Sequence, residues 1–283
     1  MQSEYFITSR LDDNVLSLDE DQFKELKRVR KRLSSAYAIT HKFRLVNANL
    51  QMVLDAMSRL GRLYVDQAGS EALETAKPHL NACVNNYVLS ARIFTSQLKR
   101  HVQACVPQER DLTEALTRQM EKEYRLSFAY RFVDSLYDYV SQYGISIHTL
   151  MLESLAEEDE NGDIFRRYSL KALVEKDYIG GPAEFRVSVF EEVEEQINLI
   201  DVLSEFNESV NRLHDYAMDL VKIATDESNQ LISEFINVFV AEHGKEHNNL
   251  FVVHMTSALK NKIYDKFPIS MYANNHNMER EYV

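Results

Sequence analysis

The sequence predicts an all-α protein in the form of a long-helix bundle, with additional long helices in its C-terminal part. The 283 residues include only 7 glycines and 4 prolines, whereas sheet proteins use many turns and turns use both residues. The first glycine is Gly61 and the first proline is Pro78, so long stretches contain no helix breaker. Apolar side chains in these stretches recur at intervals of mostly three and four, which is the period of one helix face.

Three long helices are expected in the N-terminal half. The first runs from about residue 20 to residue 67, as one long helix or as two in near continuity. The second begins at Pro78, which suits a first helical turn, and ends near residue 104. The third runs from about residue 109 to residue 143 and stops at Gly144, a typical residue after a helix C-terminus.

The C-terminal half is expected to begin with less regular segments. Residues 153–163 (ESLAEEDENGD) carry six acids and no cation, and are interpreted as a loop that is either a regulatory element or a solvated linker. Residues 164–178 are expected to be a short helical or irregular piece. We expect residues 1–155 to form an N-terminal helical bundle and residues 164–283 to form a C-terminal helical region packed on it.

Long helices are then expected to follow Pro182. The first carries a seam with a heptad-like period, which packs either inside the fold, the favoured alternative, or between subunits. Two amphipathic helical segments, residues 228–243 and 249–267, come after it. The seam consists of Leu203, Phe206, Val210, Leu213, Ala217, Leu220 and Ala224.

Composition and charge argue against several classes of protein. The chain has no apolar segment typical of a signal peptide and no run of about 18 apolar residues, so we expect neither secretion nor a membrane span. Cys83 and Cys105 match no zinc spacing and cannot form a disulfide framework, so we expect buried thiols in a reducing cytoplasm. A net charge of −12 argues against a general affinity for nucleic acid.

One segment is nevertheless strongly basic. KELKRVRKR, residues 24–32, carries six cations and one glutamate. Its simplest interpretation is one solvated helix face; the alternatives are an edge that contacts phosphates or a surface that binds an acidic surface. The candidate nucleic-acid-binding residues are Lys24, Lys27, Arg28, Arg30, Lys31 and Arg32.

No motif for a nucleotide, cofactor or metal is evident, and we expect none of these ligands. No two glycines have the spacing of a phosphate-binding loop. His243 and His247 are four residues apart, with His254 nearby, and could face one ligand on an unbroken helix. Because Gly244 lies between them at an expected helix end, solvated or capping histidines are favoured over a metal or general-base role.

Asp134 and Asp138 lie one helical turn apart, where like charges repel. Such a pair could hold a cation or share a proton. Ion pairing with Arg131 and Arg125 is the simpler interpretation.

Two neighbouring segments resemble a known family. YRFVDSLYDYVSQYGISIH, residues 130–148, is similar to a stretch of the HEPN-type helical proteins of bacteria, many of which belong to defence and toxin–antitoxin systems. In active members this stretch runs aromatic-Arg-Phe, then Leu-Arg-Asn-Tyr, two further residues, His and often Gly. VNNYVLSARIFTSQLKRHV, residues 84–102, resembles the helix that precedes it, in which an Asn, a small-residue turn and a closing His recur.

The resemblance implies metal-independent cleavage of RNA, in which a His acts on the 2′-hydroxyl and an Arg steadies the phosphate, usually between two protomers. Here the Arg position is Tyr137, the Asn position is Asp138 and the His position is Gln142, while Tyr139 and Gly144 match. Gln142 exchanges no proton near neutral pH, and Tyr137 carries no positive charge. Asp138 adds a negative charge where a phosphate would lie, so the resemblance implies a degenerate site. The alternative is that residues 135–148 are only a tyrosine-rich core helix.

Three functions remain open. The favoured one is a non-catalytic interaction or regulatory protein, oligomeric with itself or with a partner protein; an antiviral-defence or toxin–antitoxin setting is implied by the resemblance alone. The second is a metal-independent ribonuclease or nucleotide-handling enzyme with a rearranged site. The third, made least favoured by the net acidity, is a nucleic-acid binder that uses residues 24–32. For the second, the candidate bases are His101, His148 and His214, and the candidate cations are Arg92, Arg100 and Arg131.

Overall fold

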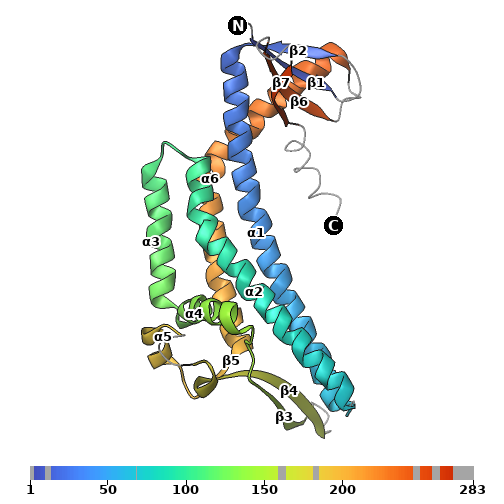
Figure 1. Cartoon of the computed structure of the whole chain (residues 1–283), viewed down its shortest axis with the longest axis vertical. Coiled ribbons are helices and arrows are strands. Elements are labelled where there is room, and N and C mark those ends of the chain that lie inside the picture. The colour runs from blue at the N-terminus through green and yellow to red at the C-terminus, as the bar shows by residue number, and fades with distance from the viewer. Residues whose placement is uncertain are drawn as a thin grey trace. The chain divides into compact units, whose positions relative to one another are not determined.

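The computed structural model shows a mixed fold that is mainly helical (Figure 1). Of the residues that the structure describes, 70% are helical, mainly in six α-helices, and 20% lie in seven strands that form two antiparallel sheets. The prediction of an all-α fold is therefore wrong, because segments expected to be loops, irregular pieces or a C-terminal helix are strands. The residues described are 3–9, 14–67, 69–158, 164–180, 185–244, 249–256 and 262–269.

The first two predicted helices are present, with different ends. α1 spans Glu20–Val65 and α2 spans Ser70–Cys105. A reciprocal cap starts α1: the Gln22 amide donates to Asp19 Oδ1 at 2.7 Å, and the Asp19 amide donates to Gln22 Oε1 at 2.9 Å. Pro78 lies inside α2 rather than in its first turn, because the helix already begins at Ser70.

The third predicted helix is two helices. α3 spans Arg110–Leu126 and α4 spans Phe128–Tyr143. Ser127 between them has an extended backbone, and its hydroxyl accepts a hydrogen bond from the Tyr130 amide at 3.1 Å, so it caps α4. Gly144 ends α4 in the left-handed conformation (φ 70°), as predicted.

The remaining helices are α5, Val187–Glu192, and α6, Leu199–His243. α6 joins the predicted seam helix and the amphipathic segment 228–243 into one long helix. Its seam is buried from Leu203 to Ala217, which agrees with packing inside the fold. No helix in the described ranges has the length and apolarity needed to cross a membrane.

A three-stranded sheet occupies the place of the predicted acidic loop and of the piece after it. Its strands are β3 Thr149–Glu158, β4 Ile164–Glu175 and β5 Gln196–Asn198, in the order β3-β4-β5. Residues 153–158 of the predicted loop thus belong to a strand, and residues 159–163 lie outside the described part.

Cross-strand pairing explains why so acidic a segment forms a strand. Glu153 pairs with Lys171 across the β3–β4 ladder at 2.8 Å, and Glu157 pairs with Arg167 at 3.3 Å. Both pairs are diagonal, two positions apart in the register, and opposite charges within reach on neighbouring strands stabilise the pairing. On the other face Leu152 lies opposite Leu170, which gives the hairpin an apolar side.

A four-stranded sheet combines the two ends of the chain. Its strands are β1 Ser3–Ser9, β2 Val15–Leu18, β6 Leu250–Thr256 and β7 Lys262–Pro268, in the order β2-β1-β6-β7. The helix expected over residues 249–267 is therefore wrong. LFVVHMT is rich in β-branched and aromatic residues, which favour strands, and this preference outweighs its apparent helical period.

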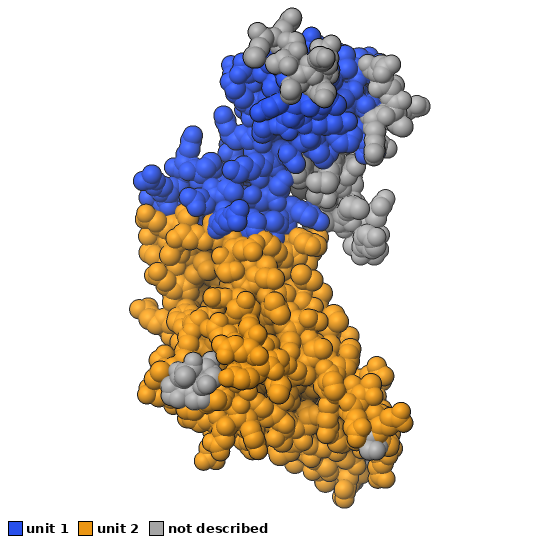
Figure 2. Space-filling model, viewed as in Figure 1, with its two compact units in different colours: residues 1–38, 100–112, 218–283 blue, residues 39–99, 113–217 orange. Residues whose placement is uncertain are grey.

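The chain forms two compact units, each built from several stretches of sequence (Figure 2). Unit 1 contains residues 1–38, 100–112 and 218–283, and unit 2 contains residues 39–99 and 113–217. These units do not coincide with the expected division into residues 1–155 and 164–283, because the β3–β4 hairpin of unit 2 spans that boundary.

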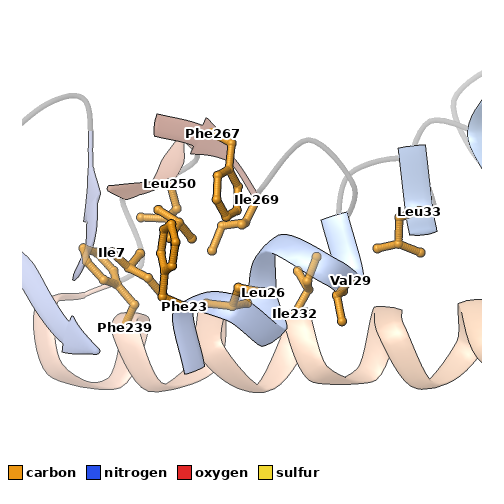
Figure 3. Packing of buried hydrophobic residues seen from close by; sticks show 11 residues of the cluster. Ile7, Phe23, Leu26, Val29, Leu33, Ile232, Phe239, Leu250, Phe267 and Ile269 are labelled. Carbon is orange, nitrogen blue, oxygen red and sulfur yellow. The ribbon is translucent and has the colours of Figure 1, made fainter. Parts of the chain in front are cut away.

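The core of unit 1 lies where the four-stranded sheet packs on α1 and α6. Figure 3 shows Phe23 of α1 pointing toward Leu250 and Phe239 of α6 pointing toward Ile7, both of the sheet. These side chains are at most 6% exposed, so the sheet depends on both helices for its apolar cover.

Both cysteines are free and buried, as expected. Cys105 lies in unit 1 beside Arg32, whose Nε donates to the Cys105 carbonyl at 2.8 Å. Burial raises the pKa of the Cys105 thiol to about 12. These contacts favour a packing role for this residue.

Candidate functional site

The residues aligned with the HEPN motif lie near the C-terminal end of α4, in unit 2. Tyr137 and Asp138 are half-buried, whereas Gln142 is exposed and makes no hydrogen bond within the described residues. The ring of Tyr137 lies against the guanidinium of Arg92 on α2, with 5.5 Å between the guanidinium carbon and the ring centroid. Tyr137 therefore lies beside a cation, although it supplies none itself.

The central feature of this region is a cluster of two arginines and two aspartates. Asp134 contacts the guanidinium of Arg92 through Oδ1, and its Oδ2 lies 2.6 Å from Nη1 of Arg186. Asp138 contributes a longer contact, 3.5 Å from its Oδ2 to Nη2 of Arg186. Each guanidinium thus has a carboxylate partner, and the side chain of Asp134 is only 11% exposed. We call these four residues the Arg92–Asp138 cluster.

The electrostatics of the cluster hold Arg186 in its charged form. Burial alone would lower the pKa of Arg186, but the carboxylate of Asp134 and the hydroxyl of Tyr124 keep that pKa above its ordinary value. Arg186 Nη1 donates to the Tyr124 hydroxyl at 2.9 Å. The cation is thus engaged on two sides by groups of the chain itself.

Almost no space remains beside the cluster. The cavity bordered by Arg92, Tyr130 and Asp134 has a volume of about 10 Å³, which is room for about one water. Small-molecule sites measure about 300 Å³ or more. As it stands, this cavity cannot hold a nucleotide.

Arg131, a candidate cation and a predicted partner of the aspartates, has a different role. Its Nη1 donates to the carbonyls of Tyr124, Arg125 and Ser127 at 2.9–3.2 Å, and its Nη2 pairs with Glu192 at 2.5 Å. Arg131 therefore stabilises the junction between α3 and α4. Ion pairing does occupy the aspartates, but the partners are Arg92 and Arg186 and not the predicted Arg131 and Arg125.

The candidate bases lie elsewhere. His148 accepts a hydrogen bond at Nδ1 from the Glu175 amide (3.1 Å), its Nε2 is buried without a partner, and burial lowers its pKa. His214 stacks on Phe43 with ring centroids 3.8 Å apart. His101 lies in unit 1. None of the three borders the cavity beside Arg92.

The histidines considered as possible metal ligands do not form a common site among the described residues. His243 Nε2 lies 3.2 Å from the carbonyl of Val15, and the ring of His254 stacks on Tyr5 with centroids 4.5 Å apart. His247 lies outside the described residues. Among the residues that are described, no group of three or more potential ligands could hold a metal ion.

The basic segment 24–32 lies on α1 in unit 1, and most of its cations have partners. Lys24 pairs with Glu20 at 2.7 Å and Lys27 with Asp265 at 2.5 Å. The guanidinium of Arg30 lies over the ring of Phe267 at 5.0 Å. Arg32 donates to the Cys105 carbonyl and to the Ser228 hydroxyl.

Arg28 and Lys31 are the two exceptions in this segment. Both are exposed, and neither makes an ion pair or a hydrogen bond with any residue in the described ranges. The segment is therefore neither uniformly solvated nor uniformly neutralised.

Comparisons with known protein families, with curated proteins and with solved structures give no match to this chain. The interpretation of the site therefore depends on its geometry and on the resemblance in residues 84–148.

Sequence reasoning missed two members of this region, Arg186 and Tyr124. Arg186 is 48 positions from Asp138, and Tyr124 belongs to a different helix from both. No local spacing links these residues. Only the folded arrangement of α3, α4 and the start of α5 brings them together.

Proposed function

We propose that the chain is a non-catalytic interaction protein and that the C-terminal end of α4 does not cleave RNA. The observation that carries the proposal is the internal neutralisation of the Arg92–Asp138 cluster. A phosphate that binds to Arg92 or Arg186 must compete with Asp134, which is nearly buried and already pairs with both guanidinium groups. Removing such a carboxylate from its partners is costly.

The other requirements of the reaction are also unmet at this place. A general base must lie within hydrogen-bond reach of the hydroxyl that it deprotonates. Gln142, at the position of the catalytic His, is exposed and does not titrate. The adjoining cavity of about 10 Å³ is bordered by no histidine among the described residues.

The remainder of the proposal concerns the biological setting. A place in a bacterial defence or toxin–antitoxin system, on a HEPN-like scaffold, has the resemblance of residues 84–148 as its support. A protein without catalytic activity would act by binding partner proteins, in a homo- or hetero-oligomer. A cytoplasmic location is part of the same proposal.

The test is RNA cleavage by the purified protein in chelator. We expect no cleavage by the natural sequence or by Gln142→Ala. The restored variant combines Tyr137→Arg, Asp138→Asn and Gln142→His, so that it supplies the cation and the base and removes the opposing charge. A variant with Tyr137→Arg and Asp138→Asn alone is its control, because it lacks the base.

Cleavage by the natural protein that persists in Gln142→Ala would refute the non-catalytic function. Cleavage by the restored variant and not by its control would support the resemblance. If all variants are inactive, the non-catalytic function stands and the resemblance loses its functional support.

A further inference from the structure

Unit 1 contains a groove that is separate from the α4 region. Its volume is about 850 Å³, within the range of about 300–1,000 Å³ that ligand sites occupy. One wall is the basic face of α1, with Arg28, Lys31 and Arg32. The opposite wall is α6, with Leu220 and Ile223, and all of the lining residues belong to unit 1. We call it the unit 1 groove.

The cations of the groove differ from those of the Arg92–Asp138 cluster because most have no ion-pair partner among the described residues. Arg28, Lys31 and Arg100 are exposed and make no ion pair with any residue of the described part. The chain as a whole has 44 acidic residues against 32 basic ones, so carboxylates able to neutralise these cations are abundant elsewhere. Cations that form no ion pair leave a positive charge at the surface, and this charge attracts an acidic ligand.

The other wall is apolar. Ile223 is 75% exposed, although isoleucine is among the residues most often buried. Leu220, one turn earlier on α6, and Val106 and Pro107, between α2 and α3, continue the apolar surface. The groove thus presents a cationic side and an apolar side to the same occupant.

This combination favours a protein segment over nucleic acid. Single-stranded nucleic acid bound along a groove commonly stacks its bases on aromatic rings, and none of the described residues that line the groove is aromatic. Glu109 and Glu227 also line it. They repel a phosphate backbone, which is charged along its whole length, whereas a peptide can keep its acids away from them. A peptide helix can instead place acids against the cations and apolar residues against Ile223.

We propose that the unit 1 groove binds an acidic amphipathic helix of a partner protein. Arg28 and Lys31 are three residues apart, or about 4.5 Å along the axis of α1, and this spacing matches acids one turn apart on a bound helix. The apolar face of the bound helix covers Ile223 and Leu220. The inference rests on the proposed function, because it assigns a partner chemistry to a protein that acts by binding.

The probe is a displayed library of random 16-residue peptides, selected on the full chain. Counter-selection uses the double variant Arg28→Glu with Lys31→Glu. Enriched peptides should carry Asp or Glu at helical spacing together with an apolar face. One enriched peptide is then titrated by fluorescence anisotropy, beside a 20-nucleotide single-stranded RNA.

Matched variants separate the groove from the net charge. Lys77→Glu with Lys99→Glu makes the same charge change at exposed positions of α2 outside the groove. Ile223→Ser tests the apolar wall, with Val238→Ser, at a residue 46% exposed on the same helix, as its control. We expect peptide affinity to fall at least about tenfold in the groove variants and less than about twofold in the controls.

Three results would overturn the proposal. The first is the absence of enriched peptides, or enrichment without acids. The second is an equal loss of affinity in the groove and control variants. The third is RNA binding that the groove variants abolish while the peptide does not bind, which would assign the groove to phosphates. The RNA-cleavage test is separate, since activity there would refute the non-catalytic function without touching the groove.

Discussion

The substitution Asp134→Asn tests how much the ion pairs of the Arg92–Asp138 cluster contribute to the free energy of unfolding. Asparagine preserves the shape of the side chain and removes its charge. Arg92 and Arg186 would each lose their closest carboxylate, in a place where Asp134 is only 11% exposed. Destabilisation of the folded chain is the expected result.

The magnitude follows from the exposure of the partners. Removing one member of a fully buried ion pair costs about 3–5 kcal/mol, whereas an exposed pair contributes about 0.2–1 kcal/mol. The side chains of Arg92 and Arg186 are 37% and 36% exposed, so solvent screens part of each interaction. We expect about 1 kcal/mol for each pair and therefore about 2 kcal/mol for Asp134→Asn.

Asp138→Asn is the matched control. Asp138 makes one contact of 3.5 Å with Arg186 and is 46% exposed, so its loss should cost at most about 0.5 kcal/mol. Because the chain has no tryptophan, urea unfolding is best followed by far-UV circular dichroism. The reasoning is refuted if the two variants lose the same stability, or if Asp134→Asn loses less than about 0.5 kcal/mol.

Two further predictions follow from buried groups. With a pKa of about 12, Cys105 is thiolate in only about one molecule in 10⁴ at pH 8, so iodoacetamide should label it in urea but not in the native protein; rapid native labelling, located by peptide mass, would contradict this. For Glu123, burial opposes the charge, but hydrogen bonds from Arg212 prevail and lower its pKa below the ordinary value of 4.5. Such a carboxyl stabilises the fold above about pH 4.5 and loses that contribution as the pH falls through its folded pKa. Glu123→Gln should therefore cost more stability at pH 7 than at pH 3 in urea unfolding, and an equal cost at both would count against the assignment.

The helices were predictable because their signals are local. The absence of glycine and proline before Gly61 and the apolar spacing placed α1 nearly correctly, and Gly144 marked the end of α4. The signal that divides the third predicted helix is also local, since Ser127 is a good N-cap residue. Its effect was masked by apolar spacing that continues on both sides of it.

The strands were not predictable in the same way, because they depend on distant partners. Leu152 and Leu170 are on opposite strands of one hairpin, so their pairing is not a period within either segment. β6 pairs with β1 from the other end of the chain. A short apolar run such as LFVVHMT fits either a strand or a helix until that partner is known.

The candidate site, too, was predictable only in the part that depends on local spacing. Asp134 and Asp138 were found from their spacing, and ion pairing was the favoured interpretation. The predicted partners, Arg131 and Arg125, are near in sequence, but Arg92 and Arg186 occupy the aspartates. Arg131 is near Asp134 in sequence, but its guanidinium is held by backbone carbonyls at the junction between α3 and α4 and by Glu192. The aspartates pair instead with arginines that the fold brings from α2 and from the start of α5.

One physical difference separates the two groups of arginines in this protein. In the Arg92–Asp138 cluster each guanidinium already has a carboxylate, so an incoming anion competes with Asp134. In the unit 1 groove Arg28, Lys31 and Arg100 have no such partner in the described chain, so an incoming carboxylate has no ion pair of these residues to break there. The free energy available for binding an anion is therefore larger in the groove, even though the sequence resemblance directs attention to α4. This difference is why we propose that the interaction surface lies in unit 1 and that the end of α4 has a structural role.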